Sequence, residues 1–448
     1  MRKYILSISA LFIILLSSIA QDSPWTLEEC INYAMENNIL IKQTELNTQY
    51  NENTLSQSKL NRLPNLNVSS SYNISFGRSL DYSSYEYVDE RTNNAYAGIA
   101  SDANLFNGFQ QKNTIEKNKF NLLASIENTS KIKNDISLNI AAAFLQILFS
   151  QELLNVAKNQ LEITTQQVER TQKLVDAGKL AKGSALEIQA QYASEELNVI
   201  NAENQLVMAY LNLQLMLDMQ YDPEFQIVNP DLATPETSEM LDDVKDVYAN
   251  AEQNMPQVKS SEYSLMAAEE DLEIAKGALY PSLGISANSG SRWSDHAVDL
   301  RPGADDVYTF GEQANDYFSV GIGLNLNIPI FNRMQVKTGI ANARINIENS
   351  ELELQSTKNE LYRSILQSFV DASGALKKYN STEKALISME ESFKYTEKKF
   401  EVGLVNTVDY NTSKNQLTVT QSELLQAKYD FIFKTKILNF YKGEPITL

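Results

Sequence analysis

One long stretch without helix breakers limits the folds that this chain can adopt. Residues 109–177 contain neither glycine nor proline, and an uninterrupted helix of that length would span roughly 100 Å. Within it, apolar and small polar residues alternate at spacings of four and three, which keeps one seam facing a partner helix over many turns. The seam consists of Ile136, Ile140, Ala143, Ile147, Ser150, Leu154, Ala157, Leu161, Thr164, Val168, Thr171 and Val175. A compact domain has no use for such a helix, so the chain is expected to span a distance.

The same seam occurs a second time, 225 residues further along the chain. Its members are Leu361, Ile365, Ser368, Ala372, Ala375, Tyr379, Thr382, Leu386, Met389, Phe393, Thr396 and Phe400. Nearer the start of each half the offset is 217 residues, as between Pro64 and Pro281, so the second half holds an insertion between Pro281 and Phe331. The chain is therefore read as a tandem duplication, and the insertion is expected in an exposed loop.

The composition and the N-terminus indicate an exported, acidic protein. The 448 residues carry a net charge of −19, which disfavours nucleic-acid binding. Residues 1–20 combine a basic start, an apolar run and a Ser-Ile-Ala ending, typical of a secretory signal peptide. The run is short for a membrane anchor, and no later segment is apolar enough to predict a transmembrane helix. The single cysteine, Cys30, cannot form an intrachain disulfide and is expected to be a buried small hydrophobe.

Four segments alternate apolar and small or polar residues, which predicts β-strands with one apolar face. These strands are expected in two pairs, at about 65–77 and 95–106 in the first half and at about 282–292 and 316–330 in the second. The clearest alternation runs from Phe318 to Ile330, where bulky apolar residues interleave with glycine, serine and asparagine.

The predicted strands have the length and facing pattern of transmembrane strands in an exported protein. Aromatic residues lie near their loop-side ends, where an interfacial girdle would be. They are Tyr82, Tyr85, Tyr87, Trp293, Tyr308, Phe310 and Tyr317. Four strands cannot close a barrel, since the smallest bacterial barrels have about eight, and open edges in lipid leave backbone groups unpaired. Several copies are therefore expected to share one barrel. A soluble sandwich with one hydrated face is the alternative for any single strand.

Each half is expected to end in an antiparallel helical hairpin with a glycine at its tip, Gly178 or Gly403, because glycine favours a left-handed helix cap. The predicted organisation is a signal peptide at 1–20, a first repeat at 21–221 with its hairpin at 109–219, a proline-containing linker at 222–239, a second repeat at 240–442 with its hairpin at 333–441, and a tail at 443–448.

This arrangement resembles the TolC family of outer-membrane efflux and secretion ducts over the whole mature chain. The motifs that carry the resemblance are the strand-to-helix junctions Leu105-Phe106-Asn107-Gly108 and Ile330-Phe331-Asn332-Arg333, and the tip Phe400-Glu401-Val402-Gly403-Leu404 followed by Val408-Asp409. The resemblance implies a membrane α+β fold, a tandem-duplicated protomer with four transmembrane β-strands and long antiparallel α-helical coiled coils. Three protomers would form a 12-stranded β-barrel in the outer membrane and an α-helical tunnel in the periplasm.

The resemblance also implies a function and partners. The resemblance implies that the chain is the outer-membrane exit duct of a tripartite efflux or type I secretion system. Such a duct conducts substrates passively and has no cofactor. The expected partners are two further copies of the chain, outer-membrane lipid, a periplasmic adaptor protein, and an inner-membrane transporter of the RND, ABC or MFS type.

Two sets of tip residues follow from the family motif. The adaptor-contact tip comprises Val402, Gly403 and Leu404, which match the motif, and Ala177, Gly178 and Lys179, which depart from it at the repeat-related tip. The periplasmic aperture, or gate, comprises Asp409, Thr412 and Ser184. The family has two acidic positions there: Asp409 matches the first, and the neutral Thr412 occupies the second. Ser184 is the equivalent of Asp409 in the first repeat. Alternatively, Asp409 only stabilises the start of its helix, by a few tenths to about 1 kcal/mol.

Two other classes of function are considered. An enzyme is not expected, because the chain has one histidine, His296, no second histidine or cysteine for a metal site, and no evident nucleophile–base pair. A trimeric structural or adhesive outer-membrane stalk would also combine strands with coiled coils, but such proteins usually pair one anchor with a passenger. Conductance in a planar bilayer separates a duct from a stalk.

Overall fold

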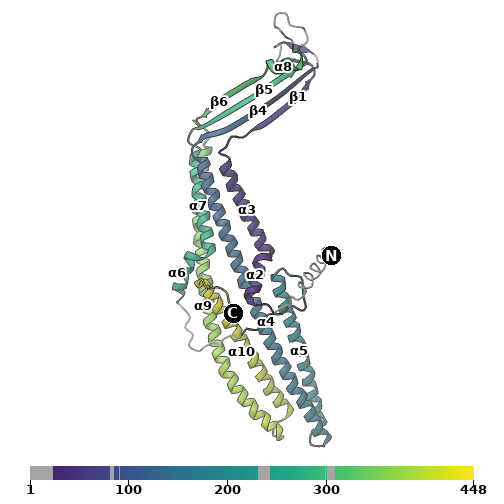
Figure 1. Cartoon of the computed structure of the whole chain (residues 1–448). Helices are drawn as coiled ribbons and strands as arrows, with labels where there is room; N and C mark the ends of the chain where they lie inside the picture. The colour runs from purple at the N-terminus through teal and green to yellow at the C-terminus, as the bar shows by residue number, and fades with distance from the viewer. Residues whose placement is uncertain (1–23, 81–84, 90, 231–242, 298, 300–307) are drawn as a thin grey trace, which may run out of the picture. The chain divides into compact units, whose positions relative to one another are not determined.

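The computed structural model describes residues 24–80, 85–89, 91–230, 243–297, 299 and 308–448 (Figure 1). The predicted signal peptide at 1–20 and the part of the predicted linker at 231–239 lie outside the described residues. The chain divides into two compact units, and each draws on both repeats. The helical unit is Met1–Leu46, Glu127–Lys259 and Gln355–Leu448, and the sheet unit is Asn47–Ile126 and Ser260–Leu354.

The sheet unit contains one antiparallel sheet built from both repeats (Figure 1). Its strands are β1 (Asn67–Ser75), β4 (Thr92–Asn107), β5 (Ser282–Ser294) and β6 (Ser319–Asn327). They lie in the order β1-β4-β5-β6, so the ladder between β4 and β5 joins the two repeats. A separate small hairpin consists of β2 (Arg78–Leu80) and β3 (Tyr87–Asp89). Both strand pairs predicted from the alternation are present, although their ends differ from the expected ones.

One difference lies just before β6. Residues 316–318, predicted as the start of the strand, instead form the last residue of the short helix α8 (Phe310–Asp316) and the turn that follows it. Thr309 caps α8: its hydroxyl accepts from the Glu312 N–H at 3.4 Å, and the Glu312 carboxylate accepts from the Thr309 N–H at 3.0 Å. This reciprocal capping box starts a helix, and it outweighs the alternating pattern that follows.

The strands pass into the long helices through the same unusual backbone in both repeats. Gly108 and Phe109 have φ of 65° and 63°, and the repeat-related Arg333 and Met334 have φ of 53° and 65°. Two successive left-handed residues turn the chain sharply from the strand direction into the helix. The first copy needs glycine for a further reason, because a Cβ at Gly108 would lie 2.1 Å from the carbonyl oxygen of Gly277.

Two helices of equal length dominate the protein. They are α4 (Gln110–Asp176) and α9 (Gln335–Glu401), with 67 residues each. All twelve residues of each predicted seam are buried or half-buried, as expected. The helices α5 (Lys182–Met216) and α10 (Thr407–Lys442) return from the two tips and complete the hairpins of the helical unit (Figure 1). The seven-residue rhythm therefore identifies the faces of α4 and α9 that pack within one chain.

Helix α5 carries two seven-residue registers, and only one of them is buried in this chain. The buried register consists of Ile188, Glu195, Val199, Ala202, Ala209 and Leu213. The other register is apolar throughout and consists of Leu186, Ala190, Ala193, Leu197, Ile200, Val207 and Leu211. Four of its large residues remain exposed: Leu186, Leu197, Ile200 and Val207. A contiguous apolar stripe on a helix normally marks an interaction surface, so this second register is available for a contact outside the single chain.

A hydrophobic cluster on α4 forms the core of the helical unit. Ile140, Phe144, Ile147 and Leu148 are almost completely buried there. The helix α2 (Leu27–Asn37) adds Cys30, which has no exposed surface, and the Thr26–Glu29 capping box predicted for its start is present. Burial raises the pKa of the Cys30 thiol to about 12, as expected for a packing residue. The remaining helices are α3 (Ile39–Leu60), α6 (Val244–Asn254) and α7 (Pro256–Gly277).

Contrary to the prediction, one described helix, α4, includes a window that is long and apolar enough to cross a membrane by composition alone. Half of that window is buried inside the protein. Its apolar residues are therefore accounted for by the core of the helical unit.

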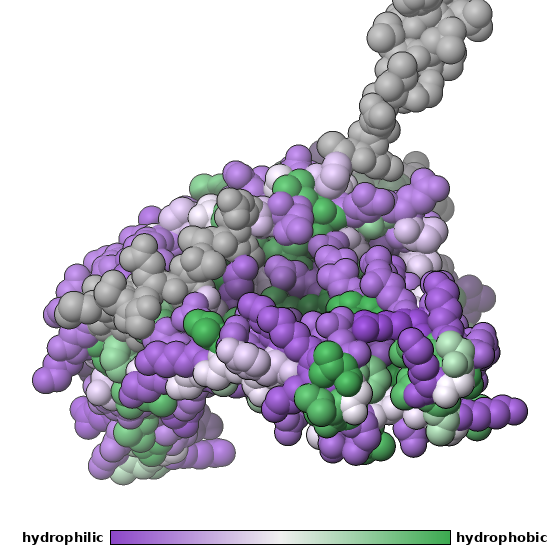
Figure 2. All heavy atoms as spheres, turned by 90° about the horizontal axis from the view of Figure 1, so that it is seen from below, coloured by the Kyte–Doolittle hydropathy of each residue, from purple (hydrophilic) through white to green (hydrophobic). Residues whose placement is uncertain are grey.

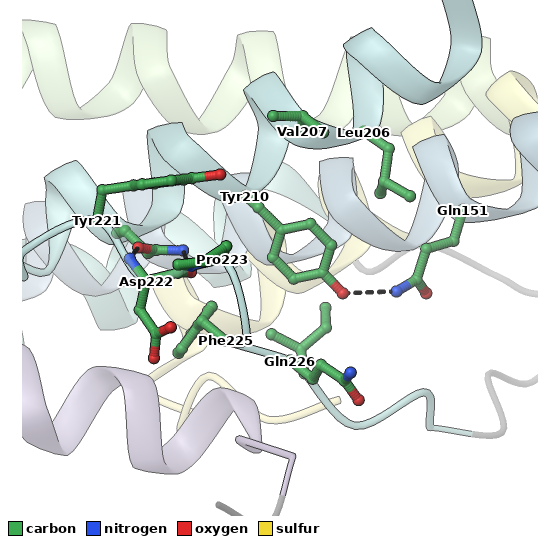
Figure 3. A pocket seen from close by; sticks show the side chains of 11 residues that line it. Gln151, Leu206, Val207, Tyr210, Tyr221, Asp222, Pro223, Phe225 and Gln226 are labelled. Carbon is green, nitrogen blue, oxygen red and sulfur yellow. Dashed lines mark hydrogen bonds between the residues drawn. The ribbon is translucent and has the colours of Figure 1, made fainter. Parts of the chain in front are cut away.

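The first part of the predicted linker is packed against the helical unit (Figure 3). The side chain of Gln214 makes two hydrogen bonds to the backbone of Asp222. It accepts from the Asp222 N–H at 2.7 Å and donates to the Asp222 carbonyl at 3.0 Å. Phe225 and Ile227 are buried, and the Tyr210 hydroxyl beside them accepts a hydrogen bond of 2.8 Å from Gln151. Residues 222–228 therefore form a strap packed against the helical unit, and the linker at 222–239 as a whole stays a prediction.

Candidate functional site at the helical tips

Both helical tips end as the glycine spacing predicts. Gly178 and Gly403 have φ of 71° and 77°. After each glycine, the next N–H donates to a carbonyl five residues earlier: Lys179 to Leu174 at 2.8 Å and Leu404 to Lys399 at 2.9 Å. This hydrogen-bond pattern is a Schellman cap, and it turns the chain within a few residues. The two tips are thus equivalent in backbone although their sequences differ.

The structure brings five of the nine predicted tip residues to one groove of about 880 Å³. They are Lys179, Ser184, Val402, Gly403 and Leu404. An ion pair of 2.9 Å between Arg170 and Glu401 joins the hairpins beside this groove, and both side chains are about half exposed. In the view from below in Figure 2, the surface is mostly hydrophilic and the hydrophobic residues form separate small groups. At the second tip the apolar side chains of Val402 and Leu404 are exposed.

The other predicted tip residues lie outside the lining of the groove. Ala177 and Gly178 are exposed in the turn that precedes Lys179. Asp409 and Thr412 are exposed on the first turns of α10, where the Asp409 N–H donates to the side chain of the N-cap residue Asn406 at 2.8 Å. A carboxylate at this position also interacts favourably with the helix dipole. The helix-start role of Asp409 is therefore consistent with its geometry, and a role at an aperture requires other copies.

An aromatic cluster fixes the tip of the second hairpin. Tyr410 of α10 stacks on Phe400 with ring centroids 4.6 Å apart and contacts Phe393 at 5.5 Å. Burial, reinforced by the nearby Glu397 carboxylate, raises the pKa of Tyr410 to about 12. The repeat-related position in the first hairpin is the small Ala185. The second tip therefore has an aromatic contact between α9 and α10 that Ala185 cannot make in the first.

A buried ion pair lies between the two hairpins, near these tips. The side chains of Lys414 and Glu195 are only 2% and 4% exposed, and Lys414 Nζ lies 3.2 Å from Glu195 Oε1. Burial lowers the pKa of Lys414, and the Glu195 charge opposes that shift. Removing one partner of such a pair typically costs about 3–5 kcal/mol, because the other charge is left buried alone. This pair is therefore a buried polar contact between the two hairpins that is sensitive to the loss of either partner.

Lys414 and Glu195 were not predicted as site residues from the sequence, although their spacing carries a partial signal. Lys414 falls between Tyr410 and Leu417 at spacings of four and three, and Glu195 lies seven residues after Ile188. Each charge thus occupies a seam position of its helix, where apolar residues are usual. The sequence gives no indication that these two residues, 219 positions apart, pair with each other.

The sheet presents a second candidate surface, a broad apolar face. Its large side chains are exposed on β1 and β6 and on the residues just beyond them: Leu66, Val68, Tyr72, Ile74, Phe76, Val320, Ile322, Leu324, Leu326, Ile328 and Ile330. The opposite face carries mainly serine, asparagine and glycine, and Asp102 and Arg292 are its charged residues within β1, β4, β5 and β6. Within the described residues, β1 and β6 each pair along one edge only.

Such a sheet, continuous in sequence with helices long enough to cross the periplasm, defines the class of outer-membrane channel proteins. The profile of the family described as outer membrane efflux protein matches residues 30–218 and 247–433. These two segments cover most of the chain, one in each repeat. The chain belongs to the outer membrane efflux protein family.

Individual relatives are similar over nearly the whole chain. The outer membrane protein TolC of Vibrio cholerae serotype O1 is 24% identical over 419 residues, covering 91% of this chain and 88% of that protein. The outer membrane efflux protein BepC of Brucella suis biovar 1 is 20% identical over 412 residues, covering 91% and 83%. The crystal structure of CusC has a TM-score of 0.78 at 18% identity and covers 96% of each chain.

These similarities confirm the predicted fold class, the duplicated protomer of an outer-membrane channel with membrane strands and long antiparallel helices. They also confirm the location, the outer membrane with the helices in the periplasm.

Among the described residues, no group of three or more His, Cys, Asp or Glu could hold a metal ion.

Proposed function

We propose that three copies of this chain form the outer-membrane exit duct of a tripartite efflux or type I secretion system. The observation that carries the proposal is the incomplete sheet. Its apolar face is exposed, and its edge strands β1 and β6 each have one unpaired side among the described residues. Unpaired edges are costly in lipid, and β6 of one copy can pair with β1 of the next. Three four-stranded sheets joined in this way give a 12-stranded barrel.

The exposed register of α5 supports the same assembly in the periplasm. Leu186, Leu197, Ile200 and Val207 repeat at the spacing that a partner helix requires. In a ring of three copies, this stripe faces the second hairpin of a neighbouring copy. The same three-fold association thus covers the apolar stripe of the helical unit and closes the sheet.

In this proposal the duct conducts passively, and an inner-membrane transporter of the RND, ABC or MFS type supplies the energy. A periplasmic adaptor protein docks at the tips, where the apolar Val402 and Leu404 are exposed on either side of Gly403. The first tip, Ala177-Gly178-Lys179, offers a more polar surface. Asp409, with Thr412 and Ser184, lies at the periplasmic aperture, where a ring of three carboxylates favours cations.

Single-channel recording in planar bilayers tests the proposal. The wild-type protein is expected to conduct and to prefer cations. Asp409→Ala is expected to lower the ratio of cation to anion permeability by a factor of a few, because it removes the carboxylate ring. Thr412→Asp, one turn further along α10, is expected to raise that ratio. Absence of any conductance would favour a structural stalk, whereas conductance with unchanged selectivity in both variants would remove Asp409 and Thr412 from the aperture.

A further inference from the structure

A groove of about 380 Å³, here called the sheet groove, lies on the sheet beside α8, at the end of β5 farthest from α7 (Figure 1). Its lining includes Tyr72 of β1, Ala95 and Ala97 of β4, Trp293 of β5 and Phe310 of α8. We propose that the sheet groove holds one acyl chain of an outer-leaflet membrane lipid, which stays bound while the surrounding lipid exchanges. The proposal depends on the outer-membrane location and not on transport.

The strand register gives the sheet groove a floor of small residues between aromatic walls. Ala95 is paired on one side with Tyr72 and on the other with Trp293. Directly paired residues point to the same face, and Tyr72 belongs to the exposed apolar face of the sheet. Ala97, two residues further along β4, lies on that face too and extends the floor. The sheet groove therefore runs along β4 and opens on the lipid side of the sheet.

The helix α8 supplies a third wall and is attached to β5 by buried hydrogen bonds. Gln313 of α8 is only 1% exposed. Its side chain accepts from the Ser294 N–H at 2.9 Å and donates to the Ser294 carbonyl at 3.0 Å. Phe310, at the start of α8, lies beside Trp293 with ring centroids 6.3 Å apart. The two rings are therefore held next to each other at the outer end of the sheet groove.

This wall belongs to the second repeat alone among the described residues. Ser291, on the same face as Trp293, donates to the Ala314 carbonyl at 2.8 Å, so α8 lies against the apolar face. The helix falls in the interval between Pro281 and Phe331 that contains the insertion of the second repeat. In the first repeat, the described residues between β1 and β4 form the hairpin of β2 and β3 and no helix. The inserted length thus provides a wall that the first repeat does not have.

The sheet groove lies at the level of the outer leaflet. β5 follows α7 on the periplasmic side, so Ser294 marks its outer end. Ile285, the partner of the mid-strand Leu324, is six residues from Ser291. That separation is roughly 20 Å along the strand and, at a tilt of about 45°, roughly 14 Å along the membrane normal. Half of the hydrocarbon core is about 15 Å thick, so the sheet groove meets acyl chains close to their headgroups.

The shape and chemistry of the sheet groove suit a lipid chain. Tyr and Trp gather at membrane interfaces because their rings combine an apolar body with a polar tip. A volume of about 380 Å³ is within the usual range of small-molecule sites, about 300–1,000 Å³. A chain on a smooth barrel surface contacts protein on one side, whereas a chain in the sheet groove also contacts the aromatic walls. Since apolar contact stabilises in proportion to its area, this lipid is retained in preference to its neighbours.

Native mass spectrometry of the full-length protein, extracted from outer membranes into a mild detergent, tests this site. The wild-type protein is expected to retain one membrane lipid for each chain. Ala97→Leu fills the floor and is expected to lower the retained lipid about tenfold, the factor that displacing about two methylene groups corresponds to. Phe310→Ala removes a wall and is also expected to lower it. Phe310 is 66% exposed, so this second variant keeps the sheet intact.

Ala287→Leu is the matched control. Ala287 lies on the same face of β5, paired with Ser101, and is outside the lining of the sheet groove. The substitution adds the same bulk to the lipid side and is expected to leave the retained lipid unchanged. The site is overturned if the wild-type protein retains no lipid, if it retains only detergent, or if Ala97→Leu and Ala287→Leu retain equal amounts of lipid.

Discussion

Leu324→Arg is expected to remove the protein from the outer membrane. Leu324 lies near the centre of β6, with 68% of its surface exposed on the apolar face of the sheet. An arginine on the lipid side of a barrel costs about 2–4 kcal/mol near the middle of the bilayer, and a three-fold assembly incurs that cost three times. The neighbouring β5 residue, Ile285, pairs with Leu324 and offers no polar partner.

Asn325→Arg is the matched control, because the next residue of a strand points to the opposite face. Asn325 lies on the polar face opposite Gly284, so the arginine is expected to face the water-filled interior and to be tolerated. Cell fractionation and immunoblotting measure both variants. Equal amounts of the two variants in the outer membrane, or equal loss of both, would contradict the assignment of the faces.

Gly108→Ala is expected to have the second large effect, destabilising the first strand-to-helix junction. The left-handed backbone at Gly108 costs a residue with a Cβ about 1–2 kcal/mol. The new Cβ would also overlap the Gly277 carbonyl oxygen at 2.1 Å, and rigid backbone on both sides leaves little room for adjustment. The total loss is expected to reach about 3 kcal/mol or more.

The second repeat supplies the control, Arg333→Ala. Arg333 has a left-handed φ of 53° and already carries a Cβ, so this substitution is expected to change stability little. Thermal unfolding of the detergent-solubilised variants, followed by circular dichroism, measures the difference. A similar melting temperature for Gly108→Ala and Arg333→Ala would show that the close approach to Gly277 does not matter.

The regular parts of this fold could be predicted because they repeat. The seams of α4 and α9, the glycine caps at Gly178 and Gly403 and the alternating strands each depend on local periodicity or on one backbone conformation. The duplication doubled each signal. Periodicity does not indicate which partner covers a register: on α5 the apolar register with Leu197 and Ile200 stays exposed, whereas the register with Ile188 and Glu195 is buried in this chain.

The features that could not be predicted depend on long-range packing or on overlapping local signals. The pairing of Lys414 with Glu195 requires the two hairpins to be side by side. The packing of Phe225 on Tyr210, with ring centroids 6.2 Å apart, holds residues 222–228 of a proline-containing segment as a strap against the helical unit. The helix α8 had a recognisable capping box at Thr309 and Glu312, but the strong alternation of β6 obscured it.

A single chain leaves the sheet edges at β1 and β6 unpaired among the described residues, and three chains are expected to close one conduit. Native mass spectrometry of the protein extracted from outer membranes into detergent measures this directly. A species with the mass of three chains that persists on dilution is expected, because each copy covers the β1 and β6 edges of its neighbours. A stable species with the mass of one chain, still inserted in the membrane before extraction, would contradict it.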